Sequence, residues 1–391
     1  MANKPIYLDC NATTPVDPRV FEAMRPYFMD VFGNPGSSTH EYGDKAHEAV
    51  ENARIILAEI LHATHSSEIV FTSGATEANN IALQGIVRYL RDQNKTHVVT
   101  SRIEHKSILD VCRHLEGLQF QINYLTPNPD GTLNLSDLQE AITTHTGLIS
   151  IMHANNEIGV INPVAEIGEI ARSKGVLFHC DAAQSFGKIP LNVQAMNIDL
   201  LSVSAHKIYG PKGSGALYIR KGFPAIKLEP LFYGGGQEQG LRSGTLAPAL
   251  IVGLSEAAKI CAEIMSDESQ RLAELRNYLL KQLTEKCPDV VVNGTMKSRL
   301  PHNLNISFLG VPSDTLMMNL RNEIAVSNGS ACTSYAPMPS YVLRAIGIEG
   351  DRANSAIRFG LGRFTTKEEI DCAASSIIAN VDALRGMLPR A

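Results

Sequence analysis

The chain has 391 residues, of which 44% are hydrophobic and 19% are charged. These fractions are close to those of ordinary globular proteins, so the composition excludes a disordered or fibrous protein. The net charge of -5 gives no general attraction to nucleic acid or to an anionic membrane, and we expect no direct nucleic-acid binding.

No apolar stretch approaches the roughly 20 residues that a membrane helix needs, and residues 1–10 lack the apolar core of a signal peptide. We therefore expect a cytoplasmic protein with no membrane partner. The seven cysteines are odd in number and include no Cys-x-x-Cys pair, which argues against a disulfide framework, and we expect no metal site. They are Cys10, Cys112, Cys180, Cys261, Cys287, Cys332 and Cys372.

In chain order, residues 44–61 place apolar side chains at helical spacing with charges on the other faces, which predicts an amphipathic helix. Short apolar runs follow, separated by helical patterns such as residues 163–174. The runs are residues 69–72, 97–100, 148–152 and 176–180. Strands that alternate with helices predict an α/β fold with a mainly parallel sheet, and ligands on such sheets bind beyond the carboxyl ends of the strands.

A long helical pattern at residues 254–283 precedes a second, smaller set of strands and helices, at residues 303–308 and 355–360 among others. The last helix is predicted to begin at a capping box of Thr366 and Glu369 and to run to about residue 387. We predict a large domain over residues 16–260. Residues 1–15 and 261–391 are predicted to form a smaller α/β domain.

A polar, glycine-containing segment at residues 202–215 follows an apolar run and contains Lys207, which we expect at the end of a strand. A lysine shielded from water loses its proton more readily and can then form a Schiff base with an aldehyde cofactor. An isolated lysine beside a turn is more often an ordinary surface residue. Asp181 follows the strand at 176–180, where it could pair with a protonated pyridine nitrogen, although aspartate is also common in caps and turns.

The strand at 69–72 leads through Gly74 into a predicted helix, whose first N–H groups could hold a phosphate together with the Thr76 hydroxyl. An ordinary capped helix or a nucleotide-binding turn fits equally well, but the glycine patterns of dinucleotide and triphosphate sites are missing. His105 follows the strand at 97–100 and could stack on a cofactor ring and move protons, while a lone histidine is more often structural.

Eight segments spread over nearly the whole chain form one pattern. They are Ser-Gly-Ala-Thr-Glu at 73–77, Glu-His-Lys at 104–106, His-Ala-Asn-Asn-Glu-Ile-Gly at 153–159, Asp181 with Gln184, His-Lys-Ile-Tyr-Gly-Pro-Lys-Gly at 206–213, Arg-Ser-Gly-Thr at 242–245, Gly-Ser-Ala-Cys-Thr-Ser at 329–334 and Ser-Ala-Ile-Arg-Phe-Gly-Leu-Gly-Arg-Phe at 355–364. In order and spacing, this pattern resembles the cysteine desulfurases (NifS/IscS-like, class V aminotransferase superfamily). The resemblance implies the fold of pyridoxal-phosphate (PLP)-dependent transferases, fold type I, usually in a homodimer with shared active sites.

The resemblance also implies roles for single residues. Lys207 would carry PLP as a Schiff base and move the α proton of the substrate, and Asp181 would pair with the pyridine nitrogen. His105 would stack on the ring and exchange protons, and Gln184 would bond the ring hydroxyl. The other residues implied at the cofactor are Ala75, Thr76, Asn156, Ser204, His206 and, from the neighbouring subunit, Thr245.

Arg358, helped by Asn34 and Asn156, would hold the carboxylate of L-cysteine, a task that suits the planar fork of a guanidinium. Cys332 lies among small and polar residues, which favours an exposed loop. The resemblance makes its thiolate the nucleophile that takes the substrate sulfur, leaves L-alanine and passes a persulfide to an acceptor protein. The other six cysteines fit better as buried, inert residues.

The acceptor pathways implied are iron–sulfur cluster assembly, tRNA thiolation and DNA phosphorothioate modification. Cys10 stands where most relatives have a non-thiol residue, and Pro337 and Pro339 restrict the backbone after Cys332. We therefore expect the Cys332 loop to swing less than is typical of the family. The opening at 8–15 and the chain end soon after the last helix keep a specialised phosphorothioation desulfurase as an alternative. The alternatives are another fold-type I PLP lyase or aminotransferase, such as a selenocysteine lyase, and a non-catalytic or nucleotide-binding protein of the same architecture.

Overall fold

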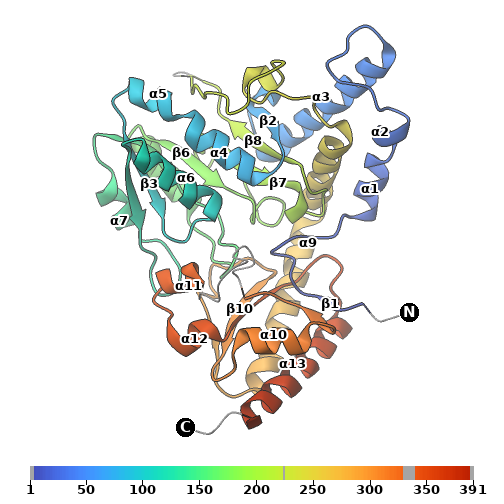
Figure 1. Ribbon diagram of the computed structural model, residues 1–391, viewed down its shortest axis with the longest axis vertical. Helices are drawn as coiled ribbons and strands as arrows, with labels where there is room; N and C mark the ends of the chain where they lie inside the picture. The colour runs from blue at the N-terminus through green and yellow to red at the C-terminus, as the bar shows by residue number, and fades with distance from the viewer. Residues whose placement is uncertain (1–3, 223–224, 329–339, 388–391) are drawn as a thin grey trace.

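The computed structural model describes residues 4–222, 225–328 and 340–387 (Figure 1). The helices are α1 Pro18–Met24, α2 Pro26–Met29, α3 Glu41–Leu61, α4 Ala75–Gly85, α5 Val87–Asp92, α6 Lys106–Gly117, α7 Leu135–Ala141, α8 Val164–Ser173, α9 Pro248–Lys286, α10 Ser313–Leu320, α11 Tyr341–Ala345, α12 Gly350–Asn354 and α13 Lys367–Met387. The strands are β1 Ile6–Tyr7, β2 Ile69–Thr72, β3 His97–Ser101, β4 Gln121–Leu125, β5 Thr146–Ser150, β6 Leu177–Asp181, β7 Leu200–Ser204, β8 Gly215–Ile219, β9 Val290–Val292, β10 Asn303–Phe308, β11 Ile324–Ala325 and β12 Ala356–Gly360.

A seven-stranded sheet in the order β2-β8-β7-β6-β5-β3-β4 occupies the upper part of the molecule in Figure 1. The pairs from β7 to β4 are parallel, while β8 pairs antiparallel with both β2 and β7. Every residue of β3, β5 and β7 is buried, as expected for strands covered on both faces. The predicted α/β fold with a mainly parallel sheet is confirmed.

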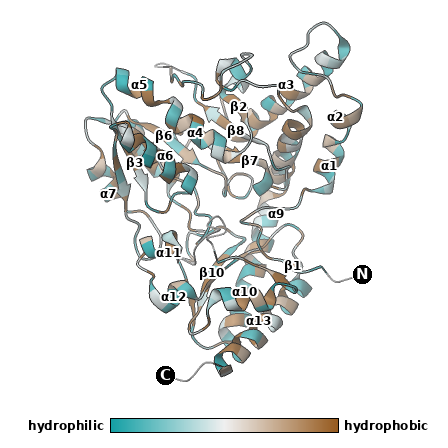
Figure 2. Ribbon diagram, in the orientation of Figure 1, coloured by the Kyte–Doolittle hydropathy of each residue, from teal (hydrophilic) through white to brown (hydrophobic). Residues whose placement is uncertain are grey.

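The chain runs from β3 outward to β4 and then continues from β5 on the other side of β3, so the strand order reverses between β3 and β5. Ligands of open α/β sheets bind near such a reversal, beyond the carboxyl ends of the strands. The surrounding helices carry both hydrophobic and hydrophilic residues, which fits helices that bury one face (Figure 2).

The lower part of the molecule in Figure 1 is built on the antiparallel sheet β12-β10-β9 and the parallel pair β1–β11. The predicted capping box at the start of α13 is confirmed: Thr366 N donates to Glu369 Oε2 (3.0 Å), and Glu369 N donates to Thr366 Oγ1 (3.2 Å). Across the described ranges, no helix has the length and apolar character needed to cross a membrane.

The helix α9 contributes to two separate hydrophobic cores. Its first half buries Leu254 and Cys261 in the core under the seven-stranded sheet, and its second half buries Leu279 and Leu283 in the core of the small sheets. Leu8 joins the second core, as the prediction for residues 1–15 requires. Because α9 runs unbroken between the cores, the domain limits at 15/16 and 260/261 stay a prediction.

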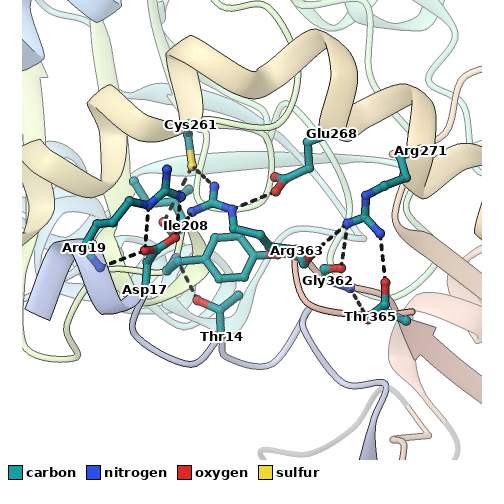
Figure 3. A network of polar contacts seen from close by, with 11 residues as sticks. Thr14, Asp17, Arg19, Ile208, Cys261, Glu268, Arg271, Gly362, Arg363 and Thr365 are labelled. Atoms are coloured by element: carbon teal, nitrogen blue, oxygen red, sulfur yellow. Dashed lines mark hydrogen bonds and ion pairs between the residues drawn. The ribbon is translucent and has the colours of Figure 1, made fainter. Parts of the chain in front are cut away.

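A buried polar network ties the two parts together beside α9 (Figure 3). Arg363, after β12, donates from Nη1 to Asp17 Oδ2 (2.8 Å) and from Nε to Glu268 Oε1 (2.7 Å). Its guanidinium lies 4.1 Å from the centre of the Tyr209 ring, and its backbone N donates to the Tyr209 hydroxyl (2.6 Å). Tyr209 is two residues from Lys207, so this network also supports the loop that carries the lysine.

Candidate active site

Two neighbouring parallel strands place Asp181 and Lys207 at the same edge of the large sheet. Asp181 is the last residue of β6, as its position after the predicted strand suggested. The strand β7 ends at Ser204, and a 3-10 turn, Ala205–Lys207, carries the lysine beyond it. The prediction that Lys207 ends a strand is thus off by three residues, because the polar segment begins to turn as soon as the sheet pairing with β8 stops.

The Lys207 ammonium is buried against main-chain carbonyl groups of the N-terminal segment. Its Nζ donates to the oxygens of Asn11 (2.7 Å) and Ala12 (2.6 Å). Burial lowers the pKa of Lys207 to about 7, and the positive charges of Arg358 and Lys188 act in the same direction. A large fraction of this lysine is therefore a neutral amine at neutral pH, the form that reacts with an aldehyde.

Asp181 is linked to His105 through two side chains that the sequence did not single out. Asn79, on α4, donates from Nδ2 to Asp181 Oδ2 (2.8 Å) and to Ser107 Oγ (2.8 Å). Ser107 Oγ in turn lies 2.8 Å from His105 Nδ1, and Asp181 Oδ1 accepts from the N–H of Ala183 (2.9 Å). This chain of bonds fixes the carboxylate and the imidazole relative to each other.

His105 has a defined tautomer in this arrangement. The backbone N–H of Ser107 donates to Nδ1 (3.1 Å), so Nδ1 holds the lone pair and a neutral ring carries its proton on Nε2. Burial lowers the pKa of His105, with the charges of Lys207 and Lys106 adding to the effect and Asp181 opposing it. The ring is therefore neutral near pH 7 and presents an N–H donor.

The start of α4 forms a cradle of unpaired N–H groups. The N-cap residue of α4 is Gly74, which has a φ of 151° and no side chain that could accept a hydrogen bond. The first backbone N–H groups of the helix, beginning with those of Ala75 and Thr76, therefore have no side-chain cap. A Cβ atom on Gly74 would make only an ordinary contact, 3.6 Å from Ser204 Oγ, so it is the positive φ rather than a lack of space that favours glycine here.

His206, in the turn Ala205–Lys207 after β7, is held by the N-terminal segment, with Nδ1 3.1 Å from Thr13 Oγ1. Burial, together with Lys207 and Lys212, lowers the pKa of His206 to about 4, so the ring is neutral at pH 7.

A cavity of about 450 Å³ lies between α4 and α6. Thr76 and His105 are among its lining residues, while Lys207 and Asp181 are not.

Gln184 is buried and uses its amide on Asn11. Its Nε2 donates to Asn11 O (3.0 Å), and its Oε1 accepts from Asn11 Nδ2 (3.2 Å). One N–H of the Gln184 amide is left for another acceptor. Asn11 thus touches both Gln184 and Lys207, although no motif in the sequence points to it.

Arg358, on β12, projects from the small sheet to this site. It donates from Nη1 to Asn156 O (3.0 Å) and forms an ion pair from Nη2 to Asp9 Oδ1 (2.7 Å). The Nε of Arg358 and the Oδ1 of Asn156 are buried and have no hydrogen-bond partner within the described ranges. Buried polar atoms are rarely left unpaired, so both atoms mark a place for a ligand.

Three predicted site residues are not joined to this cluster within the described chain. Asn34 is exposed, and its Oδ1 accepts from the N–H of Gly36 (2.9 Å) in the segment between α2 and α3. Thr245 is also exposed, which is compatible with the expected contribution to a neighbouring subunit. Cys332 lies outside the described residues. The roles of all three stay predictions.

The residues at this edge fit PLP. The Asp181 carboxylate can pair with a protonated ring nitrogen, and the uncapped N–H groups with nearby hydroxyl groups suit a phosphate. A partly buried lysine with a lowered pKa suits the aldehyde. The unpaired Asn156 Oδ1 and Arg358 Nε supply further contacts for an amino-acid ligand. These observations agree with the residue roles that the resemblance implied, which themselves stay predictions.

One prediction about the cysteines is wrong. Cys10, Cys112, Cys180, Cys261 and Cys287 are buried, as expected for inert cysteines, but Cys372 is exposed. The helical pattern around Cys372 predicts a buried side chain. In the structure, Cys372 lies on the outer face of α13, next to the buried Ala373 and Ala374.

Comparisons with known proteins agree with this geometry. The aminotransferase class-V family model matches residues 6–372. A mitochondrial cysteine desulfurase of Arabidopsis thaliana is 52% identical over 389 residues, which cover 100% of this chain and 85% of that protein. The cysteine desulfurase IscS of Rickettsia rickettsii (strain Iowa) is 50% identical, covering 98% of this chain and 93% of its own length.

A comparison with solved structures agrees as well. A NifS-like protein has a TM-score of 0.90 and 36% identity, covering 97% of this chain and 100% of its own. The expected fold of PLP-dependent transferases, fold type I, is thereby confirmed. The chain belongs to the class V aminotransferase family and, within it, to the cysteine desulfurases.

Proposed function

We propose that this cysteine desulfurase takes the sulfur from L-cysteine, releases L-alanine and carries the sulfur as a persulfide on Cys332. The chain is a PLP-dependent enzyme, as its family membership requires. The observation that carries the proposal is the readily deprotonated, partly buried Lys207 on the strand edge next to the fixed carboxylate of Asp181.

Bound PLP would supply the electron sink that makes the α carbon of the substrate acidic. Asp181, held by Asn79 and the N–H of Ala183, keeps a negative charge in place for the ring nitrogen. The N-terminus of α4, with Thr76, Ser204 and His206, would hold the phosphate.

The chain's own residues then bind the substrate and move protons. Arg358 would receive the carboxylate of cysteine on its unpaired Nε, with Asn156 Oδ1 accepting from the substrate. Lys207 Nζ would take the α proton, a role that its pKa of about 7 supports. The Nε2–H of His105 would donate to the substrate. The Cys332 thiolate would attack the sulfur atom, so that the S–S bond of the persulfide forms as the C–S bond of the substrate breaks. The electron pair of the broken bond would stay with the substrate carbon, which takes up a proton to give alanine.

We also propose a homodimer. Large apolar side chains are exposed on α1, α2 and the neighbouring part of α3, a concentration that favours a protein interface. They are Phe21 (53% exposed), Phe28 (57%), Met29 (74%), Phe32 (64%) and Tyr42 (53%). A neighbouring subunit would also bring Thr245 to the phosphate.

The sulfur acceptor is a protein of iron–sulfur cluster assembly, tRNA thiolation or DNA phosphorothioate modification. The cytoplasmic location stays a prediction.

The test compares two cysteine variants. Cys332→Ser should keep the visible absorption of bound PLP and still bind cysteine, but it should form no persulfide and no alanine. The matched control is Cys372→Ser, because Cys372 is exposed on α13, and it should behave like the wild type. Alanine formation by Cys332→Ser at the wild-type rate would refute the proposal and favour another PLP lyase, such as a selenocysteine lyase.

A further inference from the structure

A buried lysine, Lys188, acts electrostatically on Lys207 and has no carboxylate partner in the described parts of the chain. Lys188, in the turn region after β6, is only 7% exposed. Its Nζ lies 3.0 Å from Nε2 of His302, and no described acidic side chain forms an ion pair with it. Lysine is almost never buried without a paired charge, so this arrangement calls for a function.

The partner of Lys188 is a histidine that is kept neutral. His302 is 1% exposed, and burial, together with the charges of Lys188, Arg276 and Arg358, holds its pKa well below the usual range. Its Nε2 lies near two groups that can only donate, Lys188 Nζ (3.0 Å) and Asn11 Nδ2 (3.2 Å). Nε2 must therefore hold the lone pair, which places the proton on Nδ1, an atom with no partner in the described chain.

Asn11 connects this pair to Lys207. Its side chain is fixed by His302, by Gln184 Oε1 (3.2 Å) and by Asn303, whose Nδ2 donates to Asn11 Oδ1 (3.3 Å). Its main-chain oxygen accepts from Lys207 Nζ (2.7 Å). The bonds run from Lys188 through His302 and Asn11 to Lys207, so the position of one lysine depends on the other.

The charges around the two lysines leave Lys188 as the uncompensated cation. Lys207 faces Arg358, Lys188, Asp9 and Asp181, but Arg358 is paired with Asp9 (2.7 Å). Lys188 faces Cys10, Cys261, Glu268 and Arg358. These groups offer it no free negative charge, because burial raises the pKa of both thiols and Glu268 is paired with Arg363 (2.7 Å).

We propose that Lys188, held by neutral His302, is a positioning residue for Lys207: its fixed positive charge keeps the Lys207 nitrogen deprotonated, and its hydrogen-bond chain fixes the carbonyl group against which that nitrogen lies. The inference rests on the proposed function, in which Lys207 carries the cofactor. Burial lowers the pKa of Lys188 to about 8, so below that pH the amine is charged and acts on its neighbour.

The test uses the holoenzyme without substrate and follows its visible absorption against pH. Two variants remove the charge: Lys188→Met removes the hydrogen bond as well, while Lys188→Gln retains a donor to His302. Both should raise the apparent pKa of the cofactor–lysine linkage by about one unit, because a nearby positive charge has been lost. Lys188→Arg retains the charge and should restore a value near that of the wild type.

The control is Lys174→Met, at the exposed end of α8, which should leave the titration unchanged. A wild-type pKa in either Lys188→Met or Lys188→Gln, with a native circular dichroism spectrum, would overturn the inference. Borohydride fixation with peptide mapping separates the two claims. Cofactor fixed on a residue other than Lys207 would refute the proposed function, whereas cofactor on Lys207 with an unmoved pKa would refute only the role of Lys188.

Discussion

Asn79 holds both the carboxylate and, through Ser107, the imidazole of the site. Replacing it with alanine should leave Asp181 with one fewer partner and free Ser107 to turn away from His105. Losing a hydrogen bond to a charged group costs about 1.5–3 kcal/mol, so kcat/KM should fall about 10- to 100-fold.

The control for Asn79→Ala is Asn80→Ala on the same helix, since the Asn80 side chain donates to Thr76 O on the exposed side of α4. Steady-state kinetics of alanine formation would measure both variants. Equal rates for Asn79→Ala and the wild type would show that the link from Asp181 to His105 is not needed.

A substitution of Arg358 tests its proposed contact with the substrate carboxylate. Arg358→Lys keeps the charge but loses the fork that holds Asn156 O and Asp9 together, so the KM for cysteine should rise about 10-fold or more. The visible spectrum of the substrate-free enzyme should change little. Arg344→Lys, at an exposed position on α11, is the control. A wild-type KM for Arg358→Lys would exclude a contact between the Arg358 guanidinium and the substrate carboxylate.

At this scale, sequence reasoning found the residues whose chemistry is distinctive and missed those that orient them. Lys207, Asp181 and His105 follow strands in a recognisable pattern, so they could be selected. Asn79 and Asn11 are ordinary amides. Asn79 and the Asp181 carboxylate are 102 positions apart in the sequence, and only the folded chain shows that they are in contact. No local pattern encodes that contact.

Among the elements, α9 and the segment after β12 depend on Arg363 (Figure 3). Its side chain is 7% exposed, and its partners Asp17 and Glu268 are 2% and 10% exposed. Arg363→Leu would leave two buried carboxylates without this partner, so the free energy of unfolding should fall by about 3–5 kcal/mol. The free energy of unfolding of each variant is measured by urea unfolding. Arg88→Leu, which breaks the exposed pair with Glu229, should cost less than about 1 kcal/mol, and equal losses in the two variants would contradict this account.

The same network predicts a dependence of stability on pH. Hydrogen bonds from Arg19 and then Arg363 hold the pKa of Asp17 well below its usual range, against the effect of burial. A carboxyl group with a lowered pKa in the folded state stabilises the protein above its unfolded pKa of about 3.9, and this contribution is lost as the pH falls. Urea midpoints should therefore decline below about pH 4. A midpoint that rises on acidification in this range would contradict the assigned ion pairs.

The periodic elements were the most predictable ones, because their buried faces repeat in the sequence. The helix at 44–61 is observed as Glu41–Leu61, and the four apolar runs are β2, β3, β5 and β6. The antiparallel pairing of β8, which interrupts the parallel sheet, could not be predicted, because a short apolar run carries no sign of the direction of its strand.

For the whole molecule, the chain length and the change of pattern after residues 254–283 predict two domains, and this division stays a prediction. The sequence carries no sign that one helix, α9, contributes to two hydrophobic cores. The association of subunits is also a property of the whole molecule. We expect a mass in light scattering of about 85 kDa, twice the 42.5 kDa of the chain. Replacing Phe28 and Met29 together with aspartate should shift the protein toward monomer, while Met318→Asp on α10, also exposed, should not. A monomeric wild type would contradict the dimer.

The central claim is that Lys207, with its cofactor, activates L-cysteine and that Cys332 takes the sulfur atom from the same substrate molecule. Holoenzyme incubated with L-cysteine should be digested without reductant and its peptides weighed. We predict one additional sulfur atom on the peptide that contains Cys332, formed together with alanine, and none on the peptides of the other six cysteines. Alanine formation with the extra sulfur on another cysteine, or on none, would contradict the account.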